Sequence, residues 1–379
     1  MNFSYISLDP VRIITQGAAK LDAGRTFEGI PTVEQTPSGR LFAAWYAGGH
    51  GEGFDNYSLL KISDDNGKTW TGTVAAIYPD PHDVRVFDPV LWYSPDGKLY
   101  WFWAQGCGGP ANSMKVFDGI AGVWYSILEN PADAPESFRF TPPRRIANGI
   151  MMNKPTVLKD GTWCLPCSIW AGNYRQHESL GVKHGAYMVV STDQGETFSV
   201  RGRIDCSKLC EKNSFDEHIF IEREDGSICC YVRTSGGIAE SVSTDGGYTW
   251  TALALSATLK GPSSRFYLKK LRSGRLIAII NDSLTVREKL TAFLSEDDGK
   301  SWKYSLLLDP RQGVSYPDAV ETDNGLIVVY DKDRFKGGFI YMAKFTEADV
   351  MNGALTDSAS FLQHEICHSD PVPDEFQPK

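Results

Sequence analysis

Short apolar runs alternate with polar turns along the whole chain. One recurring unit is a strand-like run, a tight turn that ends in glycine, and a second strand-like run. It occurs six times, and its glycines are Gly39, Gly97, Gly161, Gly226, Gly274 and Gly325, spaced 58, 64, 65, 48 and 51 residues apart. Short apolar runs between Gly- and Asp-rich turns favour β-strands over helices. Units of this length, each a four-stranded meander, predict the blades of an all-β propeller.

An octapeptide of the form Ser-x-Asp-x-Gly-x-Thr/Ser-aromatic is a second repeat. Its four copies are 63–70, 191–198, 243–250 and 295–302. The last three end 52 residues apart, whereas the first gap is 128 residues, which fits two units of 64 with one copy missing. In such a hairpin turn the Asp side chain accepts bonds from backbone amides, and the Gly adopts a positive φ. We therefore assign the octapeptide a structural role.

The ends of the chain leave the number of blades open. Between Gly325 and Gly39, counted through both termini, there are 93 residues. This interval holds either one long closing blade or two short ones, with the termini sharing a sheet. We expect a single propeller domain that spans residues 1–379. Only short helices are expected, such as a Thr-capped turn in 345–350, and the proline-rich segment 129–143 is expected to be a loop between blades.

Composition narrows the possible functions. The chain has 38 Lys and Arg against 47 Asp and Glu, a net charge of −9, and no block of basic residues. This balance argues against nucleic-acid and anionic-membrane partners. We see no secretory leader and no apolar run of about 20 residues, so we expect a cytoplasmic protein. The eight cysteines, including the pair Cys164 and Cys167 in a strand-like run, are expected to be reduced and buried rather than to bind zinc.

Polar and charged residues gather at the starts of the predicted innermost strands. These residues are Asp88, Asn153, Lys154, Asp216, Glu217, His218, Arg265, Tyr316 and Asp318. A single charge at such a position is ordinarily solvated, but one pocket on the propeller axis would explain the whole set. We expect no required cofactor. If the aspartates Asp88, Asp216 and Asp318 converged, their oxygens would suit a Ca²⁺ ion.

The four octapeptides resemble the Asp-boxes of the sialidase (neuraminidase) superfamily, and the likeness extends over nearly the whole chain. Glu217, the turn at Gly226 and Arg233 are similar to the glutamate, glycine turn and arginine of that family. Arg287 precedes an Asp-box as a second family arginine does, and Tyr316 resembles the nucleophilic tyrosine. The resemblance implies that the arginines bind a substrate carboxylate and that Glu217 takes the phenolic proton of Tyr316.

Two departures from the sialidase pattern are important. The first family arginine belongs to an Arg-Ile-Pro motif, and the matching triplet here is Gly29-Ile30-Pro31. The acid/base aspartate of the family lies in the loop before the first Asp-box, where this chain has His50 and Glu52. The missing arginine argues against an ordinary sialidase reaction.

The segments 151–157, 215–226 and 314–318 are similar to a sialidase-like subgroup of rhamnosyl-glucuronate lyases and rhamnosidases. Members of that subgroup have seven-bladed propellers, so we expect seven blades, with six as the alternative. The resemblance implies a lyase that cleaves an L-rhamnose-α-1,4-D-glucuronate linkage by β-elimination. A base removes the proton at C5 and rhamnose leaves from O4.

The roles in this lyase reaction follow from the same resemblance. Arg233 and Arg287 would stabilise the enolate-like intermediate. Tyr316 or His218 would act as base or acid, because an imidazole titrates near neutrality. His50 would carry the chemistry if the chain follows the rhamnosidases instead.

Two further hypotheses stay open beside the lyase. One is a glycoside hydrolase, either an α-L-rhamnosidase or an exo-sialidase with Tyr316 as nucleophile and Glu52 as acid. The other is a non-catalytic propeller that binds glycans. In all three the partner is an oligosaccharide with an acidic sugar. On a molecule of net charge −9, that sugar would suit a locally positive pocket formed by Arg233, Arg265, Arg287 and Lys154.

Overall fold

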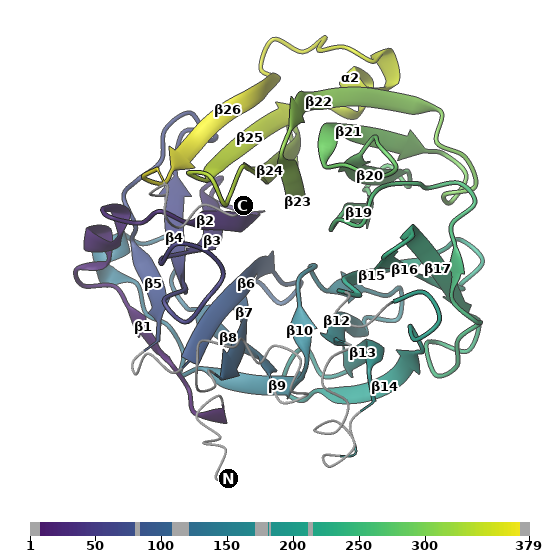
Figure 1. The fold of residues 1–379 in the computed structure, drawn as a ribbon, viewed down its shortest axis with the longest axis horizontal. Helices are drawn as coiled ribbons and strands as arrows, with labels where there is room; N and C mark the ends of the chain where they lie inside the picture. The colour runs from purple at the N-terminus through teal and green to yellow at the C-terminus, as the bar shows by residue number, and fades with distance from the viewer. Residues whose placement is uncertain are drawn as a thin grey trace.

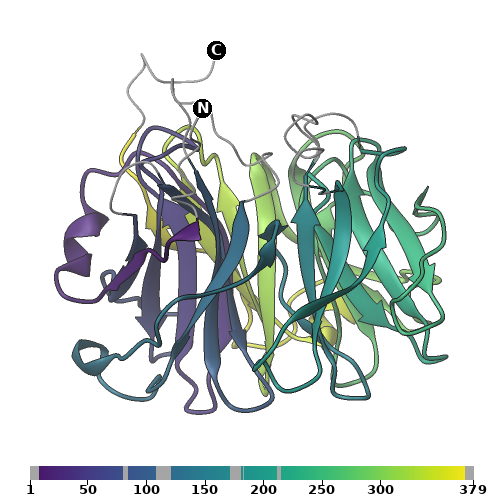
Figure 2. The ribbon, with the colours of Figure 1, turned by 90° about the horizontal axis from the view of Figure 1, so that it is seen from below.

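A computed structural model describes residues 8–79, 84–107, 121–170, 181, 183–210 and 215–371. In these ranges the chain forms six antiparallel sheets, which are arranged around one axis as the blades of a propeller (Figure 1). Each blade extends from one face of the disc to the other (Figure 2).

The first three blades use strands β1 to β14. The first blade has the order β1-β5-β4-β3-β2 and consists of β1 (Arg12–Ile14), β2 (Glu28–Gln35), β3 (Leu41–Ala47), β4 (Tyr57–Ser63) and β5 (Ala75–Tyr78). The second consists of β6 (Val84–Tyr93), β7 (Leu99–Cys107), β8 (Gly122–Leu128) and β9 (Arg144–Asn148). The third consists of β10 (Ile150–Met151), β11 (Thr156–Val157), β12 (Trp163–Ile169), β13 (Gly185–Ser191) and β14 (Ser199–Ile204).

The other three blades are plain four-stranded meanders. The fourth has β15 (His218–Glu222), β16 (Ile228–Thr234), β17 (Gly237–Ser243) and β18 (Ala254–Leu255). The fifth has β19 (Tyr267–Lys270), β20 (Leu276–Asn281), β21 (Glu288–Ser295) and β22 (Tyr304–Gln312). The sixth has β23 (Val314–Thr322), β24 (Gly325–Lys332), β25 (Phe339–Phe345) and β26 (Phe361–His368).

Helical structure is limited to short pieces in the described residues. They are the 3₁₀ turns η2 (Ala18–Asp22) and η3 (Pro135–Ser137) and the α-helix α2 (Glu347–Asn352). The predicted cap of α2 is confirmed, because the Thr346 side chain accepts a bond from the Asp349 amide, and Asp349 accepts one from the Thr346 amide. The described part of the chain contains no helix with the length and apolar character that a membrane crossing requires.

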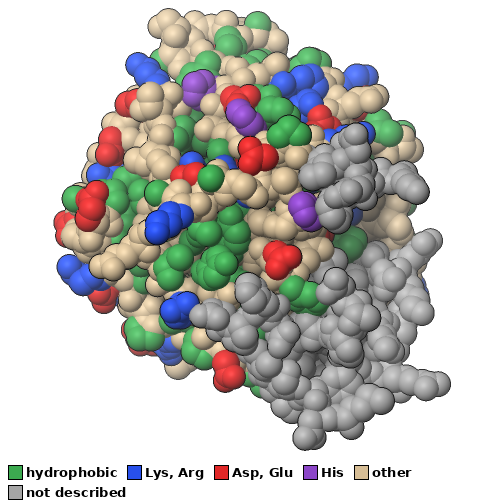
Figure 3. Space-filling view, turned by 60° about the vertical axis from the view of Figure 1, so that its left-hand side comes forward, with side chains coloured by type: hydrophobic (Ala, Val, Ile, Leu, Met, Phe, Trp, Pro, Cys, Tyr) green, Lys and Arg blue, Asp and Glu red, His purple; other side chains and the backbone are tan. Residues whose placement is uncertain are grey.

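The core lies between neighbouring blades. Its clusters combine alternate side chains from adjacent sheets, and large aromatic rings fill the wider gaps. Trp92 on β6 meets Trp163 on β12 edge-on, with 4.7 Å between ring centroids. Cys164 and Cys167 are buried free thiols on β12, as predicted. On the face that Figure 3 shows, Lys, Arg, Asp and Glu side chains are scattered among hydrophobic and uncharged ones.

Both predicted repeats fall on turns. Counted from the innermost strand, five of the repeat glycines lie between the first and second strands of their blades, and Gly325 is the first residue of the second strand β24. The four Asp-boxes connect the third and fourth strands. In the first box, Ser63 Oγ donates to Asp65 at 2.8 Å and accepts from the Gly67 amide at 2.9 Å. Bonds from Thr69 lower the pKa of Asp65 to about 2. The same arrangement recurs at Asp193, Asp245 and Asp297.

The ring closes with six blades, so the expectation of seven is wrong and the alternative of six is correct. The 93-residue interval is taken up by β24 to β26 and α2 of the last blade and by β1, η2 and β2 of the first. The first and last described strands do not share a sheet either. β1 pairs with β5 at the outer edge of the first blade, and β26 pairs with β25 at the outer edge of the sixth.

Candidate active site

The six innermost strands run in the same direction, so their first residues meet at one end of the central channel and their last residues meet at the other. We call these ends the strand-start face and the far face. The turns that carry the Asp-boxes lie at the far face, because they follow third strands that run away from the strand-start face. The Asp-boxes therefore belong to the face opposite the candidate site.

Three innermost strands share a bulge at a residue that precedes proline. Ile30, Asp88 and Tyr316 have φ values of 56°, 49° and 53°, and the strand register shifts at each of them. A positive φ is unfavourable for residues other than glycine, and a bulge redirects a side chain. The fold therefore imposes a strained backbone at these bulges, each in the first half of its strand, and such strain is a feature of functional sites.

The side chain of Tyr316, on the sixth blade, contacts residues of the fourth blade. Its hydroxyl accepts a bond from Arg233 Nη1 at 3.1 Å and lies 3.4 Å from Glu217 Oε1. The same Arg233 nitrogen donates to Glu217 Oε1 at 2.7 Å. All three side chains are buried. A carboxylate beside a tyrosine hydroxyl can take its proton, and an adjacent guanidinium favours the phenolate, so Tyr316 is a candidate nucleophile or base.

Three guanidinium groups surround Tyr316. Besides the bond from Arg233, Arg287 Cζ lies 5.0 Å and Arg334 Cζ lies 4.4 Å from the centroid of its ring. The three arginines come from three blades: Arg233 from β16, Arg287 from the residue before β21, and Arg334 from the connection after β24. The structure thus brings Arg233 and Arg287 together as predicted and adds Arg334, which the sequence analysis missed.

Arg334 lies against Gly29 on β2. A Cβ atom at Gly29 would be 2.8 Å from Arg334 Cδ and 3.0 Å from both Arg334 Cβ and Asp331 Oδ2. No side chain at position 29 is compatible with this position of Arg334. The triplet that lacks the family arginine is therefore also the place where another arginine enters the site.

Glu52, in the connection between β3 and β4, lies among cations. Its Oε1 is 3.5 Å from Arg334 Nε, and its Oε2 is 3.7 Å from Arg85 Nη2. Burial alone would raise the pKa of Glu52, but Arg334 and Arg85 outweigh burial and hold the pKa below its usual value. Glu52 is therefore ionised at neutral pH.

Asp88 has the opposite protonation state. Burial, together with the carboxylates of Glu52 and Glu217, raises the pKa of Asp88 to about 8, and Arg85 only partly offsets this rise. Asp88 consequently holds a proton at neutral pH. Near the arginines, the strand-start face thus has Glu52 as an ionised carboxylate and Asp88 as a neutral carboxyl group.

His218 is held away from this chemistry. Its Nε2 lies 2.9 Å from the Tyr187 carbonyl oxygen, and its Nδ1 lies 2.9 Å from Ser168 Oγ. Burial lowers its pKa to about 4, so the ring is neutral. These contacts fit a ring that joins the third and fourth blades. The predicted His50 is exposed, and its Nδ1 lies 2.9 Å from Thr26 Oγ1.

Two of the four cations predicted for the pocket are paired elsewhere in the channel. Arg265 Nε donates to Asn153 Oδ1 at 3.1 Å, and its Nη2 is 3.5 Å from Asp318 Oδ1. Lys154 Nζ is 2.9 Å from Glu34 Oε2 and 3.5 Å from Asp318 Oδ2. The expected positive pocket is therefore divided, because Asp318 binds these two cations below the site.

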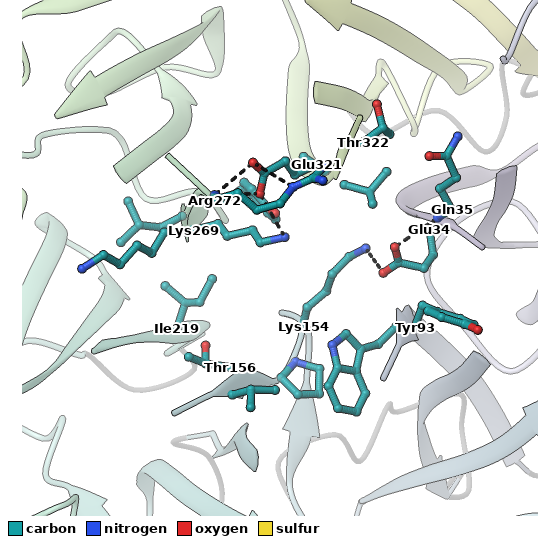
Figure 4. A pocket seen from close by; sticks show the side chains of 18 of the residues that line it. Glu34, Gln35, Tyr93, Lys154, Thr156, Ile219, Lys269, Arg272, Glu321 and Thr322 are labelled. Carbon is teal, nitrogen blue, oxygen red and sulfur yellow. Dashed lines mark hydrogen bonds and ion pairs between the residues drawn. The ribbon is translucent and has the colours of Figure 1, made fainter. Parts of the chain in front are cut away.

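Lys154 instead helps to line a cavity of about 800 Å³ at the far face. The last residues of all six innermost strands contribute to its wall. Lys154 points toward Glu34, and Arg272 lies beside Glu321 on the opposite side (Figure 4). Because these cations and carboxylates pair with one another, we do not assign a ligand to the far cavity.

The three aspartates considered for Ca²⁺ have separate surroundings. Asp318 binds Thr32 Oγ1 at 2.7 Å, whereas Asp216 is fully buried, and burial raises its pKa. Within the ranges that the structure describes, no group of three His, Cys, Asp or Glu side chains is placed to hold a metal ion.

Solved sialidase structures have the same fold. A Hadza microbial sialidase, Hz136, superimposes with a TM-score of 0.65 at 19% identity over 84% of this chain and 66% of that one. The intramolecular trans-sialidase from Ruminococcus gnavus gives 0.61 at 14% identity over 97% and 98% of the two chains. The Trypanosoma rangeli sialidase gives 0.59 at 17% identity over 81% and 52%. This chain thus spans about two thirds of the first structure and half of the third.

Sequence comparison identifies the family. No curated protein matches the chain significantly. The family model described as the BNR repeat-like domain matches residues 39–329, which is more than half of the chain. The chain therefore belongs to the BNR repeat-like domain family and folds as a sialidase-like β-propeller.

Proposed function

We propose that the protein is a glycosidase that acts on a terminal sugar carrying a carboxylate. The observation that carries this proposal is the contact of the Tyr316 hydroxyl with Glu217 and Arg233 of the fourth blade. The arginines near Tyr316 provide the planar, paired donors that a carboxylate binds best. The sialidase-like fold supports the same class of substrate.

The reaction that suits this geometry proceeds through a covalent intermediate. The substrate carboxylate binds the guanidinium groups, which places the anomeric carbon beside Tyr316. The tyrosine oxygen attacks that carbon, Glu217 takes the phenolic proton, and the bond to the leaving sugar breaks. Water then cleaves the tyrosyl-sugar bond, which releases the acidic sugar and restores the tyrosine.

Glu52 is the candidate acid for the leaving oxygen. In the free site, Arg334 and Arg85 keep it ionised. A substrate carboxylate bound at Arg334 would weaken this attraction, so the pKa of Glu52 rises when the substrate binds. Glu52 then takes up from solvent the proton that it gives to the leaving oxygen. Asp88, which already holds a proton, can donate a hydrogen bond to a sugar oxygen.

The structure reduces the support for the lyase hypothesis. That hypothesis rested on the resemblance of three segments to the lyase subgroup and on the retained site residues with the family arginine missing at Gly29. Arg334 occupies the space adjacent to Gly29. The lyase hypothesis also offered His218 as a base, yet both ring nitrogens of His218 are already engaged. Hydrolysis is therefore the favoured reaction, and elimination is retained as an outcome of the test.

The test compares two substrates and one pair of variants. We expect the protein to release the phenol from an aryl sialoside, and Tyr316→Phe to lower kcat by at least about 10³-fold because the nucleophile is lost. Tyr248→Phe is the control, since Tyr248 is an exposed tyrosine on an Asp-box turn. Both proteins should have the same circular dichroism spectrum.

Other outcomes identify the competing functions. The ultraviolet absorbance of an unsaturated uronate, formed from a rhamnose-capped glucuronate oligosaccharide, would show elimination. Free rhamnose without that absorbance would show a rhamnosidase. Binding of these sugars without any product would contradict an enzyme and support a glycan-binding propeller.

A further inference from the structure

We infer that Arg334 takes the place of the arginine missing from the start of β2 and binds the carboxylate of the substrate. The inference rests on the proposed function and adds to it a third substrate-binding guanidinium. It explains why a chain without the Arg-Ile-Pro motif retains Tyr316, Glu217 and Arg233.

The first argument is the shape of the site. Gly29 stands where the family motif carries its arginine, and Arg334 Cδ would be 2.8 Å from a Cβ atom there. The Arg334 side chain comes from the sixth blade and occupies the space that the side chain of an arginine at position 29 of the first blade would need. The two positions exclude each other, so a glycine at 29 is the condition for an arginine at 334.

The second argument is how firmly the guanidinium is held. Arg334 Nη1 lies 3.3 Å from Ser315 Oγ and 3.5 Å from Asp331 Oδ2. Asp331 also accepts a bond from the Ile30 amide at 2.9 Å and from Ser315 Oγ at 2.6 Å. One carboxylate therefore ties Arg334 to the start of β2 and to the residue before Tyr316. Such a fixed guanidinium loses little freedom when it binds a ligand.

The third argument is that the guanidinium has unused donors. Arg334 is 8% exposed. Among the described residues its Nε makes no hydrogen bond, and Glu52 Oε1 is its ion-pair partner at 3.5 Å. A guanidinium has five N–H groups, and leaving such groups unpaired in a buried site is unfavourable. A carboxylate that accepts two of them removes this penalty.

A second buried arginine shows the contrast. Arg25, which is also near the first blade and is 4% exposed, donates from Nε to Glu28, from Nη1 to Asp22 and from Nη2 to Cys367. Its donors are used within the protein, as expected of a structural arginine. Arg334 instead leaves donors for a ligand beside the ring of Tyr316.

The test measures binding rather than turnover. N-acetylneuraminic acid, D-glucuronic acid and their methyl esters are titrated calorimetrically into the full-length protein. Arg334→Met should weaken the binding of at least one free acid by about 10- to 100-fold, which is the loss of one charge-assisted pair. The matching ester, which lacks the charge, should bind the variant and the original protein equally.

Arg311→Met is the matched control. Arg311 is also stacked on a tyrosine, with Cζ 4.3 Å from the Tyr341 ring, and is also paired with an aspartate, Asp309. It lies on β22, outside the site, so its loss should change neither ligand. Thermal melts of both variants show whether a loss of binding reflects unfolding.

The exchange of positions provides a second measurement. Gly29→Arg alone should weaken acid binding and lower the melting temperature, because the new side chain collides with Arg334. Adding Arg334→Gly should restore part of the acid binding, since it vacates the space and leaves one guanidinium in the site.

The outcomes separate the two proposals. If Arg334→Met binds the acids as the original protein does while the aryl sialoside is still hydrolysed, the role of Arg334 is wrong and the proposed function stands. If the original protein neither binds an acidic sugar nor releases a product from one, the proposed function fails, and the role of Arg334 fails with it.

Discussion

At the scale of single residues, Asp88 shows how the site is linked to pH. It is a buried carboxyl group on the strained bulge of β6, and burial raises its pKa to about 8. The unfolded chain loses this proton near pH 4, whereas the folded protein keeps it to about pH 8. Asp88 therefore destabilises the fold increasingly as pH rises from about 4 to about 8.

We predict that Asp88→Asn flattens this dependence. At pH 5 the variant and the original protein should differ little in free energy of unfolding. At pH 8 the variant should be more stable by about 1–3 kcal/mol, because an amide needs no proton to remain neutral. Urea unfolding at both pH values measures the difference, with Asp64→Asn on an exposed turn as control. A variant that loses stability equally at both pH values would contradict the assigned protonation state.

The sequence predicts site residues where the residue itself stands in a pattern. Tyr316, Glu217 and Arg233 are found in this way, and the structure brings them into contact. Arg334 is not predicted because it lies in an irregular connection, and the only sign of it in the sequence is the absence of a side chain at Gly29. Arg265 and Lys154 are misplaced for another reason: their partner Asp318 is distant in the sequence. Pairing across the ring is a property of the closed fold.

At the scale of elements, each Asp-box joins two blades as well as two strands. A Cβ atom on the box glycine would collide with a side chain of the preceding blade in every copy: with Met342 at Gly67, Tyr100 at Gly195, Met188 at Gly247 and Tyr231 at Gly299. The glycine therefore provides both a positive φ and close contact between blades. The repeat glycines of the turns between the first and second strands provide only the positive φ.

The comparison of two glycines tests this double role. Gly247 and Gly226 have φ values of 97° and 83°. A Cβ at Gly247 would be 2.2 Å from Met188 Sδ, whereas nothing lies within 4 Å at Gly226. Both alanine variants should lose about 1 kcal/mol to backbone strain, and Gly247→Ala should lose a further 1–3 kcal/mol, roughly, to overpacking. Equal losses in urea unfolding would show that the contact between blades is dispensable.

The elements also show how far the sequence predicts the fold. The turns, the blades and the cap of α2 follow from local patterns such as Gly39, the Asp-boxes and Thr346, and the structure confirms them. The number of blades does not follow from such patterns. β1 is only three residues long and pairs with β5, which begins 61 residues later. Residue count alone cannot distinguish an added edge strand from the start of another blade.

At the scale of the whole molecule, polar bonds near the axis close the ring where the two ends of the chain meet. The Leu91 amide of the second blade donates to Thr32 Oγ1 of the first at 3.0 Å, and Thr32 donates to Asp318 Oδ2 of the sixth at 2.7 Å. Asp318 is fully buried and also faces Arg265 and Lys154. One carboxylate thus connects the first, third, fifth and sixth blades.

This arrangement predicts unequal effects of two conservative changes. Asp318→Asn removes the charge opposite Arg265 and Lys154, so it should lower the free energy of unfolding by about 3–5 kcal/mol, as expected when a buried pair loses one partner. Thr32→Val removes the bond from the Leu91 amide and the bond to Asp318 but leaves the ion pairs of Asp318 in place. It should therefore lower the free energy of unfolding by about 1–3 kcal/mol. Urea unfolding followed by tryptophan fluorescence measures both. An Asp318→Asn protein as stable as the original would mean that the ring closes without the charge of this carboxylate.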